Sequence, residues 1–290
     1  MFVVLLWGIN VVMIKYLTKF YPPLALAPIR LFLASCLLLP VVSCKQGYVK
    51  PSPTALRHIV GVATFSIFLH QISLSWGISL TSSNHASLIL ALNPMLTTLL
   101  SSYVMNEPFT LTKTLGILLG FGGVTLVVSG AAPGEASLLG DAIMFISTLA
   151  FVIGSLFVKK STTFLSPLIV TAYSHTLASI GLLVTGFFFN PVWSYSGAFE
   201  PLPLIVLLLS SLVNTALGAL WWNMGIQQVG AATASLFLNV QPVVGIFAAA
   251  LFLGEELYWI HYVALALVTL GVSLGTGLIG HSFRRPISGE

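Results

Sequence analysis

The sequence predicts an all-α integral membrane protein in which ten transmembrane helices form two inverted five-helix repeats, with both termini cytoplasmic. Three observations predict it: the composition, a succession of apolar runs, and an internal similarity between the two halves of the chain. The 290 residues are 57% hydrophobic and 6% charged. Because a soluble protein carries roughly 25% charged residues, this chain cannot cover a water-facing surface, and we expect a lipid bilayer around it.

The apolar runs are bounded by proline, glycine and charged residues, and each is long enough to cross a bilayer as a helix, which takes ~20 residues. Together they use most of the chain and leave no stretch for a separate soluble domain. The predicted spans are residues 2–20, 24–43, 56–80, 83–104, 110–130, 137–159, 166–188, 201–227, 231–253 and 257–280.

Lysine and arginine between the spans set the orientation, because they collect on the cytoplasmic side. With the N-terminus inside, the cytoplasmic connections and tail hold Lys45, Lys50, Arg57, Lys113, Lys159, Lys160, Arg284 and Arg285. Lys15 and Lys19 fall near the first external turn, and Arg30 falls within the second span. These residues act as topology signals, so the net charge of +4 does not indicate a nucleic-acid partner.

The two halves resemble each other when the sequence is compared with itself. A shift of 148 residues aligns the third to fifth spans with the eighth to tenth without a gap, and a shift of 144 aligns the earlier spans. The pairs include Gly77/Gly225, Ala86/Ala234, Ser87/Ser235, Pro94/Pro242, Glu107/Glu255 and Gly123/Gly271 at the first shift, and Lys15/Lys159 and Pro23/Pro167 at the second. The predicted units are a first repeat over residues 1–134, a second over 135–280 and a cytoplasmic tail over 281–290.

Five spans per half is an odd number, so the second half enters the membrane from the opposite face. Secondary transporters use such inverted repeats for alternating access around a site near the middle of the membrane. An integral membrane enzyme would need a cluster of catalytic polar residues, and the seven acidic residues are scattered. A channel usually needs an oligomer around a pore, whereas a duplicated single chain favours a monomeric carrier that binds a small-molecule substrate without a cofactor.

Several short patterns resemble those of one known family. They are Trp7-Gly8-x-Asn10, Pro28-x-Arg30 and the paired stretches Ala86-Ser87-x5-Asn93-Pro94-x12-Glu107 and Ala234-Ser235-x5-Gln241-Pro242-x12-Glu255. With the duplicated layout, they make nearly the whole chain similar to the EamA-type branch of the drug/metabolite transporter superfamily. The resemblance implies a central cavity lined by the first, third, fourth, sixth, eighth and ninth helices. It also implies ATP-independent export of amino acids or related metabolites across a bacterial plasma membrane; permeases of drugs, nucleosides or sugars with the same fold are the alternative.

Polar side chains at membrane depth are costly and therefore indicate either function or interhelical contacts. Asn10, near the middle of the first span, can bond a substrate or a neighbouring helix. Lys15 and Arg30 fall in the outer half of the membrane, and our hypothesis is that they form a cationic patch that attracts a substrate carboxylate. Lys15 can instead extend to the outer head groups, which is harder for the deeper Arg30.

Histidines near the centres of the third and seventh spans, His70 and His175, can carry a coupling proton or serve as neutral hydrogen-bonding residues. His70 is the stronger candidate, because the resemblance places the third helix at the cavity. His85 falls near the outer start of the fourth span, where an interfacial position is equally suitable.

Asn93-Pro94 and Gln241-Pro242 occupy equivalent places in the fourth and ninth spans. A proline frees the carbonyl one turn earlier, so these positions predict kinks that are hinges, part of the binding region or purely structural.

The remaining cavity candidates are aromatic or amide side chains: Trp76, Trp222, Asn223 and Asn239. The tryptophans can instead belong to an interfacial belt. Glu107 and Glu255 end the fourth and ninth spans at opposite faces, and we expect structural or gating groups that bond the start of the next helix.

We expect no Asp or Glu within the membrane core. This expectation argues against proton-coupled export of lipophilic cations through a membrane carboxylate, as in the small multidrug branch of the same superfamily. It favours a substrate that itself carries a carboxylate. Facilitated diffusion and proton coupling through histidine remain open.

Overall fold

Helices joined by short connections make up the described part of the chain, which covers residues 2–104, 111–130, 137–189 and 197–275 of the computed structural model. No strand occurs in these residues, so the all-α prediction is confirmed for them. Glu107 and the predicted tail over residues 281–290 lie outside the described residues.

The first half of the chain contains α1 (Phe2–Leu17), α2 (Pro23–Gln46), α3 (Pro53–Gly61), the π-helical η1 (Val62–Leu69), α4 (His70–Leu80), α5 (Ser83–Leu90), α6 (Asn93–Val104) and α7 (Leu111–Gly130). The second half contains α8 (Leu138–Ser161), α9 (Pro167–Phe189), α10 (Pro201–Leu208), the π-helical η3 (Leu209–Leu217), α11 (Gly218–Val229), α12 (Ala231–Leu236), the 3₁₀-helical η4 (Phe237–Val240), α13 (Gln241–Leu253) and α14 (Trp259–Gly275). Each helix overlaps one of the predicted apolar runs, but several extend beyond the predicted bounds, such as α2 to Gln46 and α3 from Pro53.

Among the described residues, five continuous helices are long and apolar enough to cross a membrane, namely Pro23–Gln46, Pro53–Leu80, Leu138–Ser161, Pro201–Val229 and Thr233–Leu253. Shorter apolar helices occur at Phe2–Leu17, Thr114–Leu126 and Trp259–Leu274. The chain is therefore built to lie in a membrane, while the count of ten spans stays a prediction.

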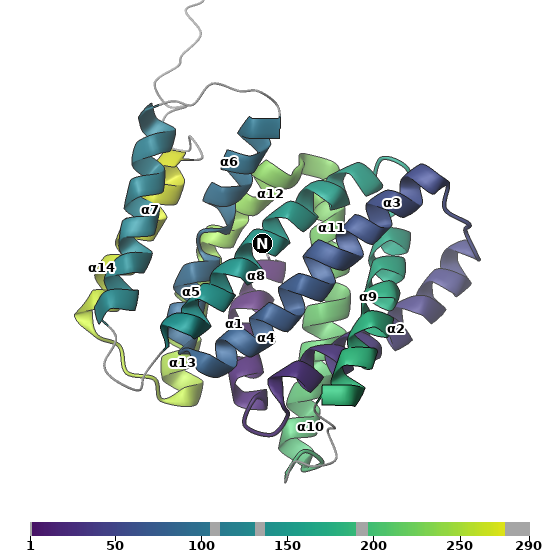
Figure 1. Cartoon of the computed structure of the whole chain (residues 1–290), viewed down its shortest axis with the longest axis horizontal. Helices are drawn as coiled ribbons and strands as arrows, with labels where there is room; N and C mark the ends of the chain where they lie inside the picture. The colour runs from purple at the N-terminus through teal and green to yellow at the C-terminus, as the bar shows by residue number, and fades with distance from the viewer. Residues whose placement is uncertain (1, 105–110, 131–136, 190–196, 276–290) are drawn as a thin grey trace, which may run out of the picture.

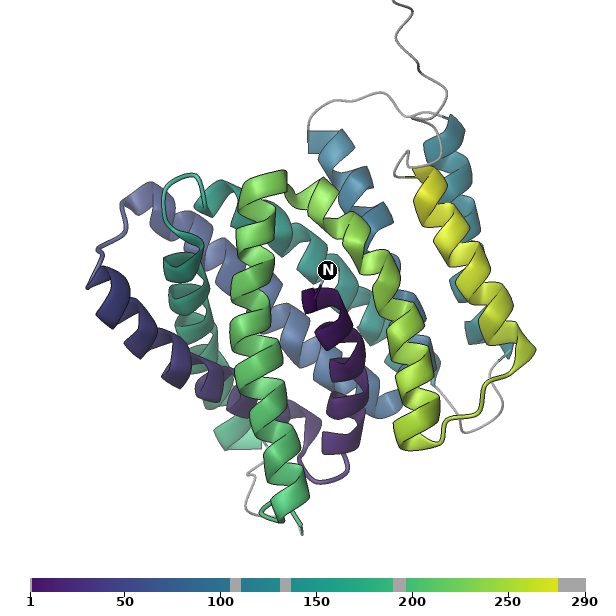
Figure 2. The ribbon, with the colours of Figure 1, turned by 180° about the vertical axis from the view of Figure 1, so that it is seen from behind.

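Helix α1 lies between two groups of helices from the second half rather than at a flank of the molecule. From behind, it is flanked by α10–α11 on one side and α12–α13 on the other (Figure 2). The pair α7 and α14 packs side by side at one flank of the molecule, and α2 packs against α9 at the other (Figure 1). Asn10 of α1 is buried between these groups of helices, so this polar side chain faces other helices rather than the surface.

Small residues allow the closest helix contacts. A Cβ atom on Gly8 of α1 would lie 2.7 Å from the Cβ of Val244 on α13. A Cβ atom on Gly271 of α14 would lie 2.5 Å from the backbone nitrogen of Gly120 on α7. Small residues at such crossings let backbones approach, which is a main source of stability when lipid surrounds the helices.

Two spans are interrupted at the positions where the sequence places proline. Helix α5 ends at Leu90, and α6 begins at Asn93, immediately before Pro94. In the second half a 3₁₀ turn separates α12 from α13, which begins at Gln241, immediately before Pro242. Proline suits the first turn of a helix because its missing N–H needs no partner there. These positions therefore start new helical segments inside the bundle.

Candidate functional site

A cavity of about 80 Å³ lies among the helices where these interruptions occur. We call it the central cavity. Elements of both halves line it, including α1, η1 and α4 from the first half and η3, α11 and α13 from the second. Its polar and aromatic lining residues are Trp7, Asn10, Arg30, Ser66, His70, Gln71, Asn93, Phe151, His175, Asn214, Thr215, Trp222, Asn223 and Gln241.

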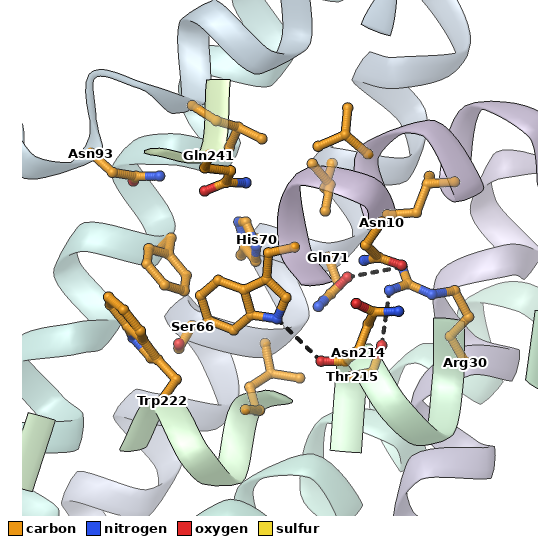
Figure 3. Close-up of a pocket in the computed structure, with 18 of the residues that line it drawn as sticks. Asn10, Arg30, Ser66, His70, Gln71, Asn93, Asn214, Thr215, Trp222 and Gln241 are labelled. Atoms are coloured by element: carbon orange, nitrogen blue, oxygen red, sulfur yellow. Dashed lines mark hydrogen bonds between the residues drawn. The ribbon is translucent and has the colours of Figure 1, made fainter. Parts of the chain in front are cut away.

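Arg30 is the charged member of this lining, and its side chain is almost completely buried, with 1% exposed. Its Nη1 donates to Gln71 Oε1 at 3.2 Å, and its Nη2 donates to Thr215 Oγ1 at 2.8 Å (Figure 3). Within the described residues, Nε has no hydrogen-bond partner and no carboxylate forms a salt bridge with this guanidinium. A buried charge is normally paired, so the cavity holds a cation with unused capacity to bind an anion.

Amide side chains surround the rest of the cavity. Asn10 accepts a hydrogen bond from Ser210 Oγ at 2.6 Å, so it joins α1 to η3 while lining the cavity. Asn93 and Gln241 lie toward one side of the space and Arg30 toward the other in Figure 3. Among the described atoms, Oδ1 of Asn93 and Oδ1 of Asn214 are buried without a partner. These oxygens can accept hydrogen bonds from a bound molecule.

The two lining histidines are held by backbone carbonyls. His70 Nδ1 lies 3.0 Å from the Ser147 carbonyl oxygen, and His175 Nδ1 lies 2.8 Å from that of Thr171. A carbonyl can only accept, so Nδ1 carries the hydrogen in both rings. Both histidines thus act as interhelical or intrahelical hydrogen-bonding residues at the cavity wall.

An aromatic cluster forms one wall. The Trp7 ring lies 5.2 Å from that of Trp222 and 5.7 Å from that of Phe151, between ring centroids. Phe151 also lies 5.0 Å from the His70 ring. Trp7 Nε1 donates to the Asn214 carbonyl at 3.1 Å, which fixes its orientation. The cavity therefore combines an apolar aromatic wall with a cationic, amide-lined region.

Lys15 and Arg30 do not form one cationic patch. Lys15 Nζ donates to the carbonyls of Ile78 at 3.0 Å and Thr81 at 2.5 Å, at the C-terminal end of α4. Lysine commonly satisfies the last carbonyls of a helix. Lys15 is therefore a capping residue, and it lines a different cavity from Arg30.

Two further candidates do not line the central cavity. Trp76 is 44% exposed on the outside of α4, which suits the interfacial alternative. Asn239 lies in η4 beside the cavity residue Leu238 but is not part of the lining. Asn223 does line the cavity and donates through Nδ2 to Thr171 Oγ1 at 2.9 Å.

A second cavity of about 340 Å³ lies where α1 and α13 end and α5 begins, and we call it the terminal cavity. Its lining is Lys15, Ser82, Asn84, His85, Gly254, Glu255, Glu256 and His261. The Glu255 carboxylate accepts from the backbone N–H groups of Ser83 at 2.9 Å and Asn84 at 3.1 Å. It thus caps α5 of the first half rather than the next helix, α14.

Asp141 is a buried acid that is absent from the predicted site residues. This residue is 5% exposed in the first turn of α8. Its Oδ1 accepts from Thr81 Oγ1 at 2.6 Å, and its Oδ2 lies 3.1 Å from His85 Nδ1. Asp141 falls inside the predicted span 137–159, but its buried partners come from α5 and the end of α4, which are distant in sequence.

Comparison with known proteins identifies the family. The EamA-like transporter family matches residues 1–129 and again residues 138–276. The chain belongs to the EamA-like transporter family. It is therefore a multi-pass membrane transporter and not an enzyme, as the sequence predicts.

Proteins similar to this EamA-like transporter include transporters named without a substrate. The uncharacterized transporter YyaM of Bacillus subtilis (strain 168) is 30% identical over 91% of this chain and 88% of its own length. An uncharacterized transporter of Archaeoglobus fulgidus is 28% identical over 92% of this chain and 93% of its own. A crystal structure of a protein with 16% identity matches 98% of this chain and 97% of that chain with a TM-score of 0.70, which shows a shared fold.

Several cavity residues of this EamA-like transporter were not predicted as site residues: Trp7, Ser66, Gln71, Phe151, Asn214 and Thr215. The repeat contains a signal for two of them, because Ser66 and Asn214 are separated by the same 148 residues that relate the two halves. Hydroxyl and amide residues at matched positions in apolar spans are a reason to expect a shared cavity.

Proposed function

We propose that this chain exports small carboxylate-bearing metabolites, with amino acids as the main class, across the bacterial plasma membrane by alternating access. The observation that carries the proposal is Arg30, a buried cation at the wall of the central cavity that has no described carboxylate partner. A guanidinium binds a carboxylate through two parallel N–H groups, and such charge-assisted hydrogen bonds are stronger than neutral ones. A substrate carboxylate would complete the pairing that the protein leaves open.

The helix breaks support an anionic group in the same place. Helices α6 and α13 both begin at the cavity wall, with Asn93 and Gln241 as their first residues. The N-terminal end of a helix carries partial positive charge. Discontinuous helices of transporters aim such ends at anionic groups of their substrates.

The aromatic wall of Trp7, Phe151 and Trp222 suits an apolar or aromatic side chain on the substrate. The cavity volume of about 80 Å³ is well below the ~300–1,000 Å³ of a pocket for drug-sized ligands. A small amino acid, or a larger one after the cavity opens, therefore fits better than a bulky drug.

Equivalent positions in the two halves support an inverted repeat of five plus five spans. The cavity is lined by pairs separated by 148 residues: Ser66/Asn214, Ile67/Thr215, Gln71/Ala219, Leu74/Trp222, Leu90/Leu238 and Asn93/Gln241. The π-helical segments Val62–Leu69 and Leu209–Leu217 also overlap under this shift. Irregular helical turns of this kind are frequent at functional sites.

The lysine caps support the same relation. Lys159, which pairs with Lys15 in the repeat, donates to the carbonyls of Ile226 at 3.4 Å and Gln227 at 3.0 Å. Ile78 and Ile226 are also a repeat pair, so each half contains the same cap. With the cytoplasmic excess of Lys and Arg, the Lys15 cap lies at the external side and the Lys159 cap at the cytoplasmic side.

These caps join helices within one half, whereas Glu255 joins the second half to α5 of the first. Contacts within a half can persist through a transport cycle in which the halves exchange conformations. A contact between halves has to break when that side opens. We therefore assign Glu255 to closure of the external side, in a carrier that works as a monomer.

The experiment is counterflow in proteoliposomes with a panel of labelled amino acids, nucleosides and sugars. We expect saturable uptake of an apolar or aromatic amino acid, reduced in Asn10→Ala and in Arg30→Ala while the purified protein keeps its thermal stability. Uptake of a nucleoside or sugar, with no amino acid transported, would replace this proposal by a neutral-metabolite permease bound through the cavity amides. Conductance without saturation would indicate a channel instead.

A further inference from the structure

The buried pair of His85 and Asp141 lies at the terminal cavity, which His85 lines, and neither residue lines the central cavity. The two side chains are 3% and 6% exposed. Both Asp141 oxygens accept hydrogen bonds, from Thr81 Oγ1 and from His85 Nδ1, as the two oxygens of a carboxylate do. Since Nδ1 of His85 donates to this carboxylate, Nε2 is the ring atom at which a proton is gained or lost.

The pair is buried but lies beside a space that water can enter. His85 lines the terminal cavity together with Asn84, and this cavity has a volume of about 340 Å³. A cavity of only ~10–15 Å³ can hold a water molecule, and the terminal cavity is larger and lined by polar groups. Protons can therefore reach the imidazole from the end of the bundle where Glu255 lies.

The pair also connects the two halves of the chain. His85 is in α5 of the first half, and Asp141 is in α8 of the second. Two residues before His85, the backbone of α5 is held by Glu255, again from the second half. The charge of the pair therefore acts on the same interface that has to separate when this side opens.

We propose that His85 and Asp141 form a proton-binding site on the external side, and that proton binding favours closure of that side. The inference rests on the proposed alternating access. A proton from external water binds Nε2 of His85 and gives an imidazolium beside a carboxylate, with no net charge. Loss of this proton leaves one negative charge. An uncompensated buried charge is costly, so the deprotonated pair favours the conformation in which water reaches this end.

The other charged or titratable residues of this region are occupied by different contacts. Lys15 bonds the end of α4, and Glu255 caps α5. Glu256 accepts from the Tyr258 hydroxyl, and His261 Nδ1 accepts from the Tyr258 backbone N–H at 3.1 Å. Lys19 lies beyond Lys15 and acts on it electrostatically. The His85 ring, by contrast, forms its described hydrogen bond with Asp141.

The test measures opening of this end without any substrate. Nitroxide labels are placed at Trp76→Cys on α4 and Leu251→Cys on α13, both exposed, after Cys36 and Cys44 are changed to serine. Electron–electron distances are measured in nanodiscs between about pH 5 and pH 8, the range in which histidine changes charge. We expect the population with the longer distance to rise several-fold toward pH 8. Asp141→Asn and His85→Gln should lose this pH dependence, and Glu256→Gln should keep it.

The proposal would be overturned if the population with the longer distance rose several-fold toward pH 8 in Asp141→Asn and His85→Gln as well. If those variants do not fold, the test uses the wild-type protein. The ¹³C signal of the His85 ring, assigned by comparison of labelled samples, is then followed over the same pH range. No change of that signal over the pH range would also overturn it. Since neither measurement uses a substrate, a failed counterflow panel would reject the proposed transport activity separately.

Discussion

The central and terminal cavities each contain a basic residue within the bundle, but the two residues are used differently. Lys15 at the terminal cavity donates hydrogen bonds to the carbonyls of Ile78 and Thr81. Arg30 at the central cavity bonds only neutral side-chain oxygens among the described residues and keeps Nε unpartnered. The hydrogen-bond partners of a membrane cation, rather than its depth, therefore distinguish a structural cap from a site for an anion.

The largest expected effect tests the binding role of Arg30. Arg30→Met removes the charge but keeps an apolar side chain of similar length. A hydrogen bond to a charged group contributes about 1.5–3 kcal/mol, so counterflow efficiency should fall about 10- to 100-fold. Initial rates over a range of substrate concentrations measure this. Thermal unfolding in detergent is the control, and a collapse of folding without a transport defect in the remaining folded protein would contradict the binding role.

A smaller effect, on stability rather than transport, is expected at Lys15. Lys15→Met leaves the last carbonyls of α4 without their described charged donor, which should lower stability by about 1–3 kcal/mol. Transport per folded molecule should stay near the wild-type value. The apparent melting temperature and counterflow of the same preparation separate the two quantities. Loss of transport at full stability would show that Lys15, like Arg30, binds the substrate.

The same change at the repeat position gives a matched comparison. Lys159→Met removes bonds to Ile226 and Gln227, one of which is long at 3.4 Å and one of which is exposed. We therefore expect a smaller loss of melting temperature than in Lys15→Met. A larger loss would contradict the view that burial determines the strength of each cap.

The smallest effect is expected at Glu255. Glu255→Gln keeps an oxygen that can accept from α5 but removes the negative charge, and changes at helix caps cost about 0.5–2 kcal/mol. The loss of this charge should raise the population in which the terminal cavity is open severalfold, as measured by the longer distance between the two spin labels described above. Glu256→Gln, one residue further on, is the matched control. Equal behaviour of the two variants would remove Glu255 from the closure of this side.

The sequence predicts helices well here because composition and apolar runs report the surrounding lipid directly. The repeat pairs also carry information about structure, since Asn93 and Gln241 both begin helices at the central cavity. Depth along a helix can be read from such patterns. The direction in which a side chain points within the bundle cannot.

Trp76, Lys15 and Asp141 illustrate this limit. Trp76 is on an outward face of α4, and Lys15 turns toward the carbonyls of that helix. Asp141 is buried because His85 and Thr81 reach it from segments about 60 residues earlier. These partners depend on how helices pack, which no local pattern records.

The central claim is that Arg30 binds the carboxylate of the substrate. The direct measurement compares counterflow of the amino acid found in the panel with that of its amide, in the wild type and in Arg30→Met. The wild type should prefer the acid by about tenfold or more, as expected for a charge-assisted pair, and Arg30→Met should transport the two compounds equally. An unchanged preference for the acid in Arg30→Met would contradict the account.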